Sequence, residues 1–259
     1  MSQTVLITGA SGGLGVEFAQ IYARRGYNLV LVSRNQEKLE KLKKKLVSVY
    51  SIRAYIYSCD LSKKDAACMI YAFLQNNHLH PSILINNAGF GDFKFYATSD
   101  WQKQYDMIQV NITALTQLTR LCLPDMIKRG RGKILNVASI AAFEPGPCMS
   151  VYYATKAFVL SFTEALAVEL RNTGITVTAL CPGPTATGFE TNANLGASPL
   201  FKLPIVGNAK DVARYGVNML DKKYVVAIPG FAAKTCVFLA KLAPRKVTRE
   251  FVFYVQRPR

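Results

Sequence analysis

Short apolar runs alternate with longer amphipathic stretches from residue 5 to about residue 230. The short runs are rich in Val, Ile and Leu, which is typical of strands that are buried on both faces. They cover residues 5–9, 28–33, 54–58, 82–86, 133–138, 175–181 and 224–228. Because stretches with helical spacing separate these runs, the pattern predicts a seven-stranded parallel sheet flanked by helices. The predicted fold class is α/β, a doubly wound Rossmann fold with a C-terminal helical extension.

Helical spacing is clearest in the charged segment 36–50, where Leu39, Leu42 and Leu46 share one face and lysines form the solvated face. Other helices are expected near residues 13–25, 62–76, 100–128 and 151–172. We find no internal repeat and no linker composition, so a single domain is predicted for residues 1–259. Within that domain, residues 188–215 are expected to form a substrate lid and residues 231–259 a basic C-terminal extension.

Composition excludes a disordered chain, because half of the 259 residues are hydrophobic and 14 Phe and 13 Tyr are among them. The formal net charge of +16 permits binding to nucleic acid, to an anionic membrane or to a phosphorylated ligand, and by itself selects none of these. From residue 194 onward the chain has 12 basic and three acidic side chains, so this last quarter carries more than half of the net charge.

The cysteines and histidines give no metal-binding pattern. The six Cys lack a C-x-x-C pair and are expected as core residues in a reducing compartment, while His78 and His80 lie in a turn before a proline. The first residues show no targeting signal, and the apolar segment 225–243 is interrupted by Pro229, Gly230 and lysines. We therefore expect a cytoplasmic protein without a bound metal.

A glycine-rich turn, T-G-A-S-G-G-L-G at residues 8–15, lies between the first predicted strand and the first predicted helix. Glycines at positions 9, 13 and 15 let the backbone approach a pyrophosphate, and the helix N-terminus offers unpaired N–H groups to that anion. The alternative is a turn that binds nothing. The location at the first strand-to-helix junction favours a dinucleotide.

The end of the second predicted strand bears on the choice of dinucleotide. An acidic residue at this position would accept hydrogen bonds from the adenosine ribose of NAD, but the chain has Ser33 and then Arg34, and the nearest carboxylate is that of Glu37. The Arg34 guanidinium can pair with a 2′-phosphate, which favours NADP(H). The alternative is an ordinary surface arginine.

A third constellation combines Ser139, at the end of the fifth predicted strand, with Tyr152 and Lys156. Residues four apart lie one turn apart on the same helix face, and a nearby ammonium would lower the pKa of the Tyr152 phenol from about 10. Such a phenol can exchange a proton with a carbonyl or alcohol oxygen, and Ser139 could hydrogen-bond the same oxygen. The alternative is an amphipathic helix that displays a tyrosine and a lysine. Tyr153 is a rival, but position 157 is Ala.

These motifs together resemble the short-chain dehydrogenase/reductase family over nearly the whole chain. Two further family motifs follow the third and fourth predicted strands: Asp60-Leu61, which contacts adenine in the family, and N-N-A-G at 86–89. After the sixth strand, residues 182–187 resemble the segment that binds the nicotinamide carboxamide, with Thr187 as its polar contact. The chain looks closest to the bacterial reductase subgroup that is similar to hydroxysteroid dehydrogenases.

The resemblance implies catalytic roles for Asn111, Ser139, Tyr152 and Lys156. It implies cofactor contacts from Gly9, Ser11, Gly13, Leu14, Gly15, Arg34, Asp60, Leu61, Asn87, Ala88, Gly89, Tyr152, Lys156, Pro182, Gly183, Thr185 and Thr187. It also implies hydride transfer at the nicotinamide C4, with Tyr152 exchanging the proton and Ser139 orienting the substrate oxygen. Lys156 would hold the nicotinamide ribose and Asn111 would position a water. The expected reaction is reduction of a ketone or aldehyde to an alcohol, with NADP(H) preferred over NAD(H).

Substrate selectivity in the family comes mainly from two segments, which are residues 140–151 and 188–204 in this chain. Phe143, Met149 and Phe189 are expected to bind the substrate, and Leu195 and Phe201 could extend the same apolar pocket. An apolar ketone or aldehyde follows, such as a steroid or an acyl chain. The alternative for these residues is simple packing.

The resemblance also predicts a homodimer or homotetramer, through the helices near 100–128 and 151–172, although the positive charge opposes association. The basic segment 231–259 could rest on an anionic membrane, or could close the substrate pocket or an oligomer interface. No nucleic-acid partner is expected, because no basic-aromatic recognition motif is present. The alternative to an enzyme is a cofactor-binding regulator, or a protein bound to nucleic acid or membrane, that has this fold without turnover. The set of Asn111, Ser139, Tyr152 and Lys156 favours the enzyme.

Overall fold

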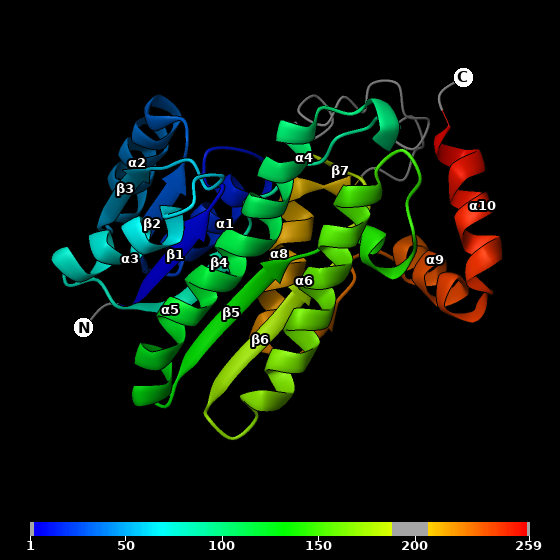
Figure 1. Ribbon diagram of the computed structural model, residues 1–259. Helices are drawn as coiled ribbons and strands as arrows, with labels where there is room; N and C mark the ends of the chain where they lie inside the picture. The colour runs from blue at the N-terminus through cyan, green and yellow to red at the C-terminus, as the bar shows by residue number, and fades with distance from the viewer. Residues whose placement is uncertain (1–2, 188–206, 258–259) are drawn as a thin grey trace.

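The computed structural model describes residues 3–187 and 207–257. Seven parallel strands form one sheet in the order β3-β2-β1-β4-β5-β6-β9 (Figure 1). The strands are β1 (Thr4–Thr8), β2 (Asn28–Ser33), β3 (Ala54–Ser58), β4 (Pro81–Asn86), β5 (Gly132–Val137), β6 (Ile175–Leu180) and β9 (Val226–Ala227). The predicted seven-stranded parallel sheet is confirmed, and each strand falls within two residues of its expected place.

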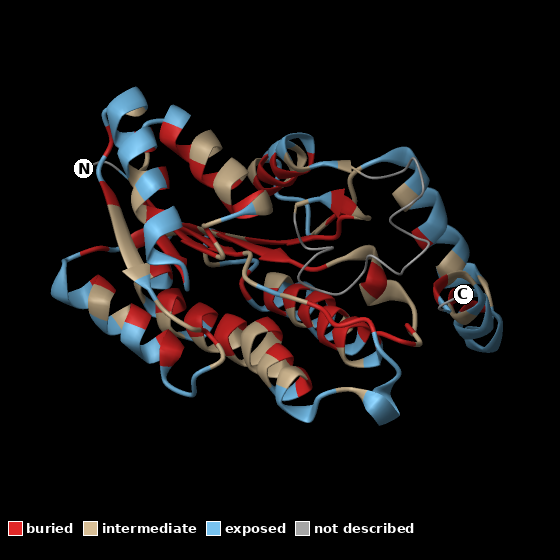
Figure 2. Cartoon of the chain, turned by 90° about the horizontal axis from the view of Figure 1, so that it is seen from above, coloured by how far each residue is buried: buried red, intermediate tan, exposed pale blue. Residues whose placement is uncertain are grey.

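Helices cover both faces of this sheet. One layer contains α1 (Gly13–Arg24), α2 (Gln36–Tyr50) and α8 (Ala209–Asp221), and the other contains α3 (Ala66–Asn76), α5 (Leu115–Lys128) and α6 (Ser150–Glu169). Figure 2 shows the strands as a buried layer between helices whose outer faces are exposed. The predicted doubly wound α/β fold is therefore confirmed.

Alternate residues of each strand enter different halves of the core. In β1, Val5 and Ile7 pack in the cluster that contains the helix α1, whereas Leu6 packs in the cluster on the opposite face. All three are fully buried. Strands buried on both faces require a continuous apolar run rather than alternation, which is why the sequence pattern located them well.

The order of the strands reverses at β1, which pairs with β2 on one side and with β4 on the other. The connections from β1 and from β4 leave the sheet toward opposite faces, so a crevice opens between their carboxyl ends. In open parallel sheets, ligands bind at this kind of switch point.

The long helix expected over residues 100–128 is interrupted. It consists of α4 (Trp101–Ile108), a π-helical turn η2 (Gln109–Ala114) and α5. A π-helical turn inserts one extra residue into a helix and often marks a functional site. Asn111 lies within this turn and is buried.

The segment after β6 differs from its expected boundaries. A short parallel pair, β7 (Thr185–Ala186) and β8 (Gly207–Asn208), was not predicted and leads directly into α8. Residues 209–215 were expected in a substrate lid, but they form the first half of α8, where Val212 and Ala213 are buried in the core. The rest of the expected lid, residues 188–206, lies outside the described residues.

Two helices end the described chain, α9 (Phe231–Leu242) and α10 (Arg245–Gln256). They project at one end of the molecule, far from α2 and α3 (Figure 1), and most of their surface is exposed (Figure 2). Across the parts of the chain that the structure describes, no helix has the length and hydropathy to cross a membrane.

Candidate active site

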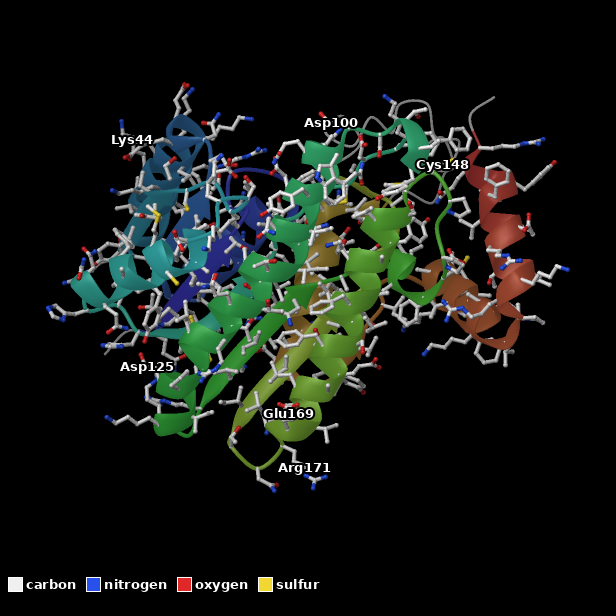
Figure 3. All side chains as sticks on the ribbon, viewed as in Figure 1. Lys44, Asp100, Asp125, Cys148, Glu169 and Arg171 are labelled. Atoms are coloured by element: carbon white, nitrogen blue, oxygen red, sulfur yellow. The ribbon has the colours of Figure 1, made fainter. Side chains whose placement is uncertain are left out.

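A cavity of about 1590 Å³ opens at the carboxyl end of the sheet. The turns after the first six strands line it, and α9 and α10 close its far side. In Figure 3, Asp100, which lines the cavity, lies at this end of the molecule, whereas Asp125, Glu169 and Arg171 lie at the opposite end. The motifs identified in the sequence therefore converge on one edge of the sheet.

The glycine-rich turn is held by close backbone packing. Gly9 has a φ of +64°, and the Asn87 amide donates to the carbonyl oxygens of Thr8 and Gly9 at 2.9 and 3.1 Å. A Cβ atom on Gly15 would lie 2.1 Å from the Gly9 carbonyl oxygen, so the helix α1 can approach the turn only with glycine there. Gly9, Ser11, Gly13 and Leu14 line the cavity, while Gly15 is not among the residues that line it.

The N-terminus of α1 faces an open space. Gly12 is the N-cap residue and has no side chain with which to cap the helix, and a Cβ atom on Gly12 would meet nothing within 4 Å. The first N–H groups of a helix carry partial positive charge and bind phosphate when nothing else occupies them. This arrangement fits the pyrophosphate of a dinucleotide.

Beside this turn, Arg34 follows β2 and lines the cavity with an exposed side chain. Asp60 and Leu61, which follow β3, line the same part of it. Burial raises the pKa of the Asp60 carboxyl, but hydrogen bonds from Ser62 and the charge of Arg34 more than offset this, so its pKa lies below the ordinary value. The Asp60 carboxyl is therefore ionised at neutral pH.

Lys38, in the first turn of α2, also lines the cavity near Arg34. The sequence predicts the lysines of this helix on a solvated face, and Lys38, at its N-terminal end, is exposed as predicted, although it also lines the cavity. Asn35 holds this end in place, because its side chain accepts a hydrogen bond from the Lys38 N–H at 2.8 Å. Asparagine is a common N-cap residue, so Asn35 could have shown from the sequence that α2 begins here and that Lys38 lies in its first turn, at the edge of the cavity.

Ser139, Tyr152 and Lys156 also line this cavity and lie close to one another. Ser139 ends the connection from β5, where its Oγ accepts a hydrogen bond from the Ala141 N–H at 3.1 Å. Its side chain also hydrogen-bonds that of Tyr152. The Lys156 Nζ lies 5.7 Å from the centre of the Tyr152 ring and donates to the Val137 carbonyl oxygen at 2.8 Å.

The expected fall in the pKa of Tyr152 is wrong for this structure. Burial raises the pKa of Tyr152 to about 12, and the hydrogen bond with Ser139 offsets only part of the rise. Burial also lowers the pKa of the Lys156 ammonium to about 8. Removing water disfavours the charged form of both groups, and burial is the largest cause of the pKa shift in each of them. Tyr152 is therefore a neutral phenol at neutral pH and holds a proton that it can donate.

Asn111 lies behind these residues and is not among those that line the cavity. Its Oδ1 accepts from the Phe90 N–H at 3.1 Å, and its Nδ2 donates to the Phe90 carbonyl and the Thr155 hydroxyl, both at 3.0 Å. The π-helical turn thus joins the loop after β4 to the helix that carries Tyr152.

Most of the other expected cofactor residues also line the cavity. They are Asn87, Ala88, Gly89, Pro182, Gly183, Thr185 and Thr187. The segment after β6 approaches the glycine-rich turn closely, since a Cβ atom on Gly13 would lie 2.8 Å from the Thr187 Cβ. This segment therefore extends from the end of β6 to the glycine-rich turn after β1.

Not all of the predicted substrate-binding residues line the cavity. Met149 lines the cavity beside Tyr152. Phe143 is not among the lining residues, and its ring lies beneath the Lys241 Nζ, 5.1 Å from it, where α9 packs. Phe189, Leu195 and Phe201 lie outside the described residues.

Among the other polar residues that line the cavity, Glu144 and Gln256 were not singled out in the sequence, and only the fold brings them to the same cavity as Tyr153. Gln256 comes from α10 and donates a hydrogen bond to the Tyr153 hydroxyl. The two residues are 103 positions apart, and no short motif in the sequence connects them. Tyr153 was considered only as a substitute for Tyr152.

Comparison with known proteins gives a consistent result. A family model described as short chain dehydrogenase matches residues 3–197. The very-long-chain 3-oxoacyl-CoA reductase-A of Danio rerio is 36% identical over 191 residues, which cover 72% of this chain and 59% of that protein. The 17-beta-hydroxysteroid dehydrogenase type 3 of Mus musculus is 37% identical over 198 residues, which cover 75% of this chain and 64% of that protein.

A solved structure is similar over nearly the whole chain. It is a short-chain dehydrogenase from Sphingobium yanoikuyae in complex with NADPH, with a TM-score of 0.83, 32% identity and coverage of 93% of each chain. The chain spans less than two thirds of the length of the two curated relatives above.

Proposed function

Because the chain belongs to the short chain dehydrogenase family, we propose that it is an oxidoreductase that reduces a carbonyl group to an alcohol at Tyr152. The observation that carries this proposal is that Ser139 and the buried side chains of Tyr152 and Lys156 line the same cavity as the glycine-rich turn. A neutral phenol beside a buried ammonium suits proton donation to a carbonyl oxygen.

Each of these side chains has a distinct part in the proposed reaction. Tyr152 donates its proton to the carbonyl oxygen of the substrate, and Ser139 hydrogen-bonds the same oxygen and orients it. Lys156 stabilises the phenolate that remains on Tyr152. Asn111 is a positioning residue, since it holds the loop after β4 against Thr155. The nicotinamide ring, when bound, supplies the two electrons of the reduction.

The dinucleotide that this site would hold is NADP(H) in preference to NAD(H). Arg34 and Lys38 both line the cavity where the adenosine ribose would lie, and a 2′-phosphate could pair with both. The Sphingobium relative is described as a complex with NADPH, which supports this assignment. Asp60 and Leu61 would contact the adenine, and Lys156 the nicotinamide ribose.

The proposed substrate is an apolar ketone or aldehyde. The cavity beyond Tyr152 is lined by Met149 and by apolar residues of the two C-terminal helices, among them Leu239, Val247 and Phe251. The names of the relatives, a very-long-chain 3-oxoacyl-CoA reductase and a hydroxysteroid dehydrogenase, support acyl chains and steroids as the classes to test first.

The test is the loss of NADPH absorbance with a panel of steroid ketones, acyl ketones and small aromatic aldehydes, with NADH in parallel. Tyr152→Phe should abolish turnover while NADPH binding, measured by fluorescence, and the far-UV circular dichroism spectrum stay unchanged. Turnover that survives this substitution would contradict the role of Tyr152. NADPH binding with no turnover of any carbonyl would favour a regulator that binds the cofactor without reaction.

We also propose an oligomeric state and a cellular compartment for the protein. We infer a homodimer or homotetramer through α4, α5 and α6, whose exposed apolar residues include Trp101, Tyr105 and Phe158. All six cysteines are free, which supports a reducing compartment such as the cytoplasm. Light scattering during size-exclusion chromatography would measure the assembly state.

A second candidate property is contact with an anionic membrane surface through α9 and α10. Val237 is the only buried residue of α9, while Phe238 and Leu242 are exposed and Lys246 and Arg249 lie nearby on α10. An apolar face flanked by cations suits a bilayer with acidic lipids. Co-sedimentation with vesicles of phosphatidylserine and phosphatidylcholine should fall in Phe238→Ser/Leu242→Ser. Equal binding by this double variant and the unaltered protein would contradict the membrane contact.

A further inference from the structure

One face of α10 is built into the wall of the cavity. Thr248, Val252 and Gln256 recur at four-residue spacing, and they are the three buried residues of this helix. Val252 packs in a cluster with Met149, Tyr152 and other apolar residues of the cavity wall. This anchor fixes the position of Gln256, one turn further along the helix.

Gln256 is 1% exposed, and only one of the two polar atoms of its side-chain amide has a hydrogen-bond partner among the described residues. Its Nε2 donates to the Tyr153 hydroxyl, whereas its Oε1 is buried and has no hydrogen-bond partner among the described residues. A buried acceptor without a partner costs about 1–3 kcal/mol, so native proteins seldom keep one without a use. Gln256 is also one of the residues that line the cavity, so this unpaired oxygen belongs to a side chain of the cavity wall.

The surroundings of Gln256 add a second acceptor. Glu144 lines the same cavity from the loop before α6 and is half-buried. Tyr153 lines the cavity as well, and the charge of Glu144, after burial, contributes to the raised pKa of its hydroxyl. The Tyr153 ring is held in place because it packs directly over Gly146, where a Cβ atom would lie 2.2 Å from the ring.

We propose that Gln256 and Glu144 form a polar subsite that accepts a hydrogen bond from a hydroxyl group of the substrate, away from the carbonyl that Tyr152 reduces. The inference rests on the proposed function and narrows its substrate class to apolar ketones that carry a second, hydroxyl-bearing position. A carbonyl or ether oxygen at that position would face two acceptors and would be disfavoured. A hydroxyl is favoured over an ammonium group, because α10 itself carries the cations Arg245, Lys246 and Arg249.

The subsite is distinct from the proton-donating group. Tyr153 is the residue next to Tyr152, and their ring centres are 6.1 Å apart in an edge-to-face arrangement. A substrate whose carbonyl reaches the Tyr152 hydroxyl therefore passes beside the Tyr153 ring. The hydroxyl group at the remote position would then determine which end of an extended substrate enters the cavity first.

The test compares three ketones that share one apolar skeleton and carry at the remote position a hydroxyl, a methyl ether or hydrogen. The unaltered protein should reduce the hydroxyketone with a kcat/KM about tenfold higher than the other two, which corresponds to one hydrogen bond of about 1.4 kcal/mol. In Gln256→Met, which keeps the length but lacks the acceptor, the three values should converge through a higher KM for the hydroxyketone. Glu250→Gln, an exposed substitution on the same helix, should keep the discrimination.

A second readout does not depend on turnover. The hydroxyketone should raise the melting temperature of the unaltered protein more than that of Gln256→Met, and circular dichroism would verify that the variant is folded. If Gln256→Met does not fold, Glu144→Gln takes its place in both measurements, with a smaller expected loss of discrimination. Equal kcat/KM values for all three ketones in the unaltered protein would overturn the subsite while leaving the reductase intact. A preference for the methyl ether would also overturn it. If no ketone is turned over, the reductase proposal fails, and a shift in melting temperature that needs Gln256 would still support the subsite.

Discussion

The Gln256 amide donates a hydrogen bond to the Tyr153 hydroxyl, and this bond ties the last helix of the described chain to the residue beside Tyr152. Both side chains are buried. The helix α6 therefore presents two adjacent tyrosines to one cavity, one facing Ser139 and the other held by the C-terminal helix.

Tyr153→Phe is expected to lower the free energy of unfolding by about 1–3 kcal/mol, because the buried Nε2 of Gln256 would lose its acceptor. Urea unfolding followed by circular dichroism measures this loss. Tyr254→Phe is the matched control, since Tyr254 is exposed on α10 and should change stability by less than about 0.5 kcal/mol. Equal effects of the two substitutions would mean that the hydrogen bond adds nothing to stability.

Two glycines of the same turn should respond in opposite ways to alanine. Gly15→Ala places a Cβ atom 2.1 Å from the Gly9 carbonyl oxygen, so we expect a loss of stability of about 1–3 kcal/mol from overpacking. Gly12→Ala meets nothing within 4 Å and has an extended backbone, so the fold should be kept. Because Gly12 precedes the helix N-terminus that faces the cavity, its new methyl group should instead weaken NADPH binding. Thermal unfolding and fluorescence titration with NADPH separate the two effects, and unchanged NADPH affinity in Gly12→Ala would argue against a pyrophosphate at this turn.

The choice of dinucleotide should depend on two cations. Replacing Arg34 and Lys38 with alanine is expected to lower kcat/KM for NADPH by about 10- to 100-fold, because two charge-assisted contacts to the 2′-phosphate would be lost. The value for NADH, which lacks that phosphate, should change little. Lys41→Ala is the control, as Lys41 lies one turn further along α2 and is absent from the residues that line the cavity. A parallel fall with both dinucleotides would contradict the assignment.

Lys156 should give stability a recognisable dependence on pH. Burial lowers the pKa of Lys156 to about 8 from its ordinary value of 10.5, so between these two pH values the folded state has released a proton that the unfolded state keeps. The resulting penalty is fully present below pH 8 and disappears as the pH rises toward 10.5. The stability of Lys156→Met relative to the unaltered protein should therefore decline between pH 8 and pH 10.5, as measured by urea unfolding at each pH. A difference that does not vary with pH would show that Lys156 has an ordinary pKa.

The sheet and the turns at its edge could be predicted from the sequence, because they depend on local signals. A run such as residues 28–33 is apolar throughout, and glycines mark the turn before α1. In an open parallel sheet the carboxyl ends of the strands meet at one edge, which is why the turns that carry Arg34, Asp60 and Ser139 line one cavity.

Other features depend on contacts between distant segments, and these could not be predicted. The place of Gln256 in the cavity wall follows from the packing of Val252 against residues near Tyr152. Phe143 was expected to face the substrate, but α9 packs over it. The pKa of Tyr152 was expected to fall because the sequence shows the neighbouring lysine, whereas it cannot show how completely water is excluded from both groups.

The position of β1 between β2 and β4 has a consequence for how the chain folds. β1 can pair with β2 early, but its other edge waits for β4, and the Thr8 hydroxyl reaches its partner, the Ile85 carbonyl, across 77 positions of the chain. Closing a loop of this length is entropically costly and slows folding, and an unpaired strand edge invites aggregation until it is covered. The pairing of β1 with β4, which forms late, is also the place where the sheet opens into the crevice beside Gly9 and Asn87. A ligand that contacts the turns after both β1 and β4 would hold these two strands together. Adding the dinucleotide during refolding should therefore raise the yield of native protein.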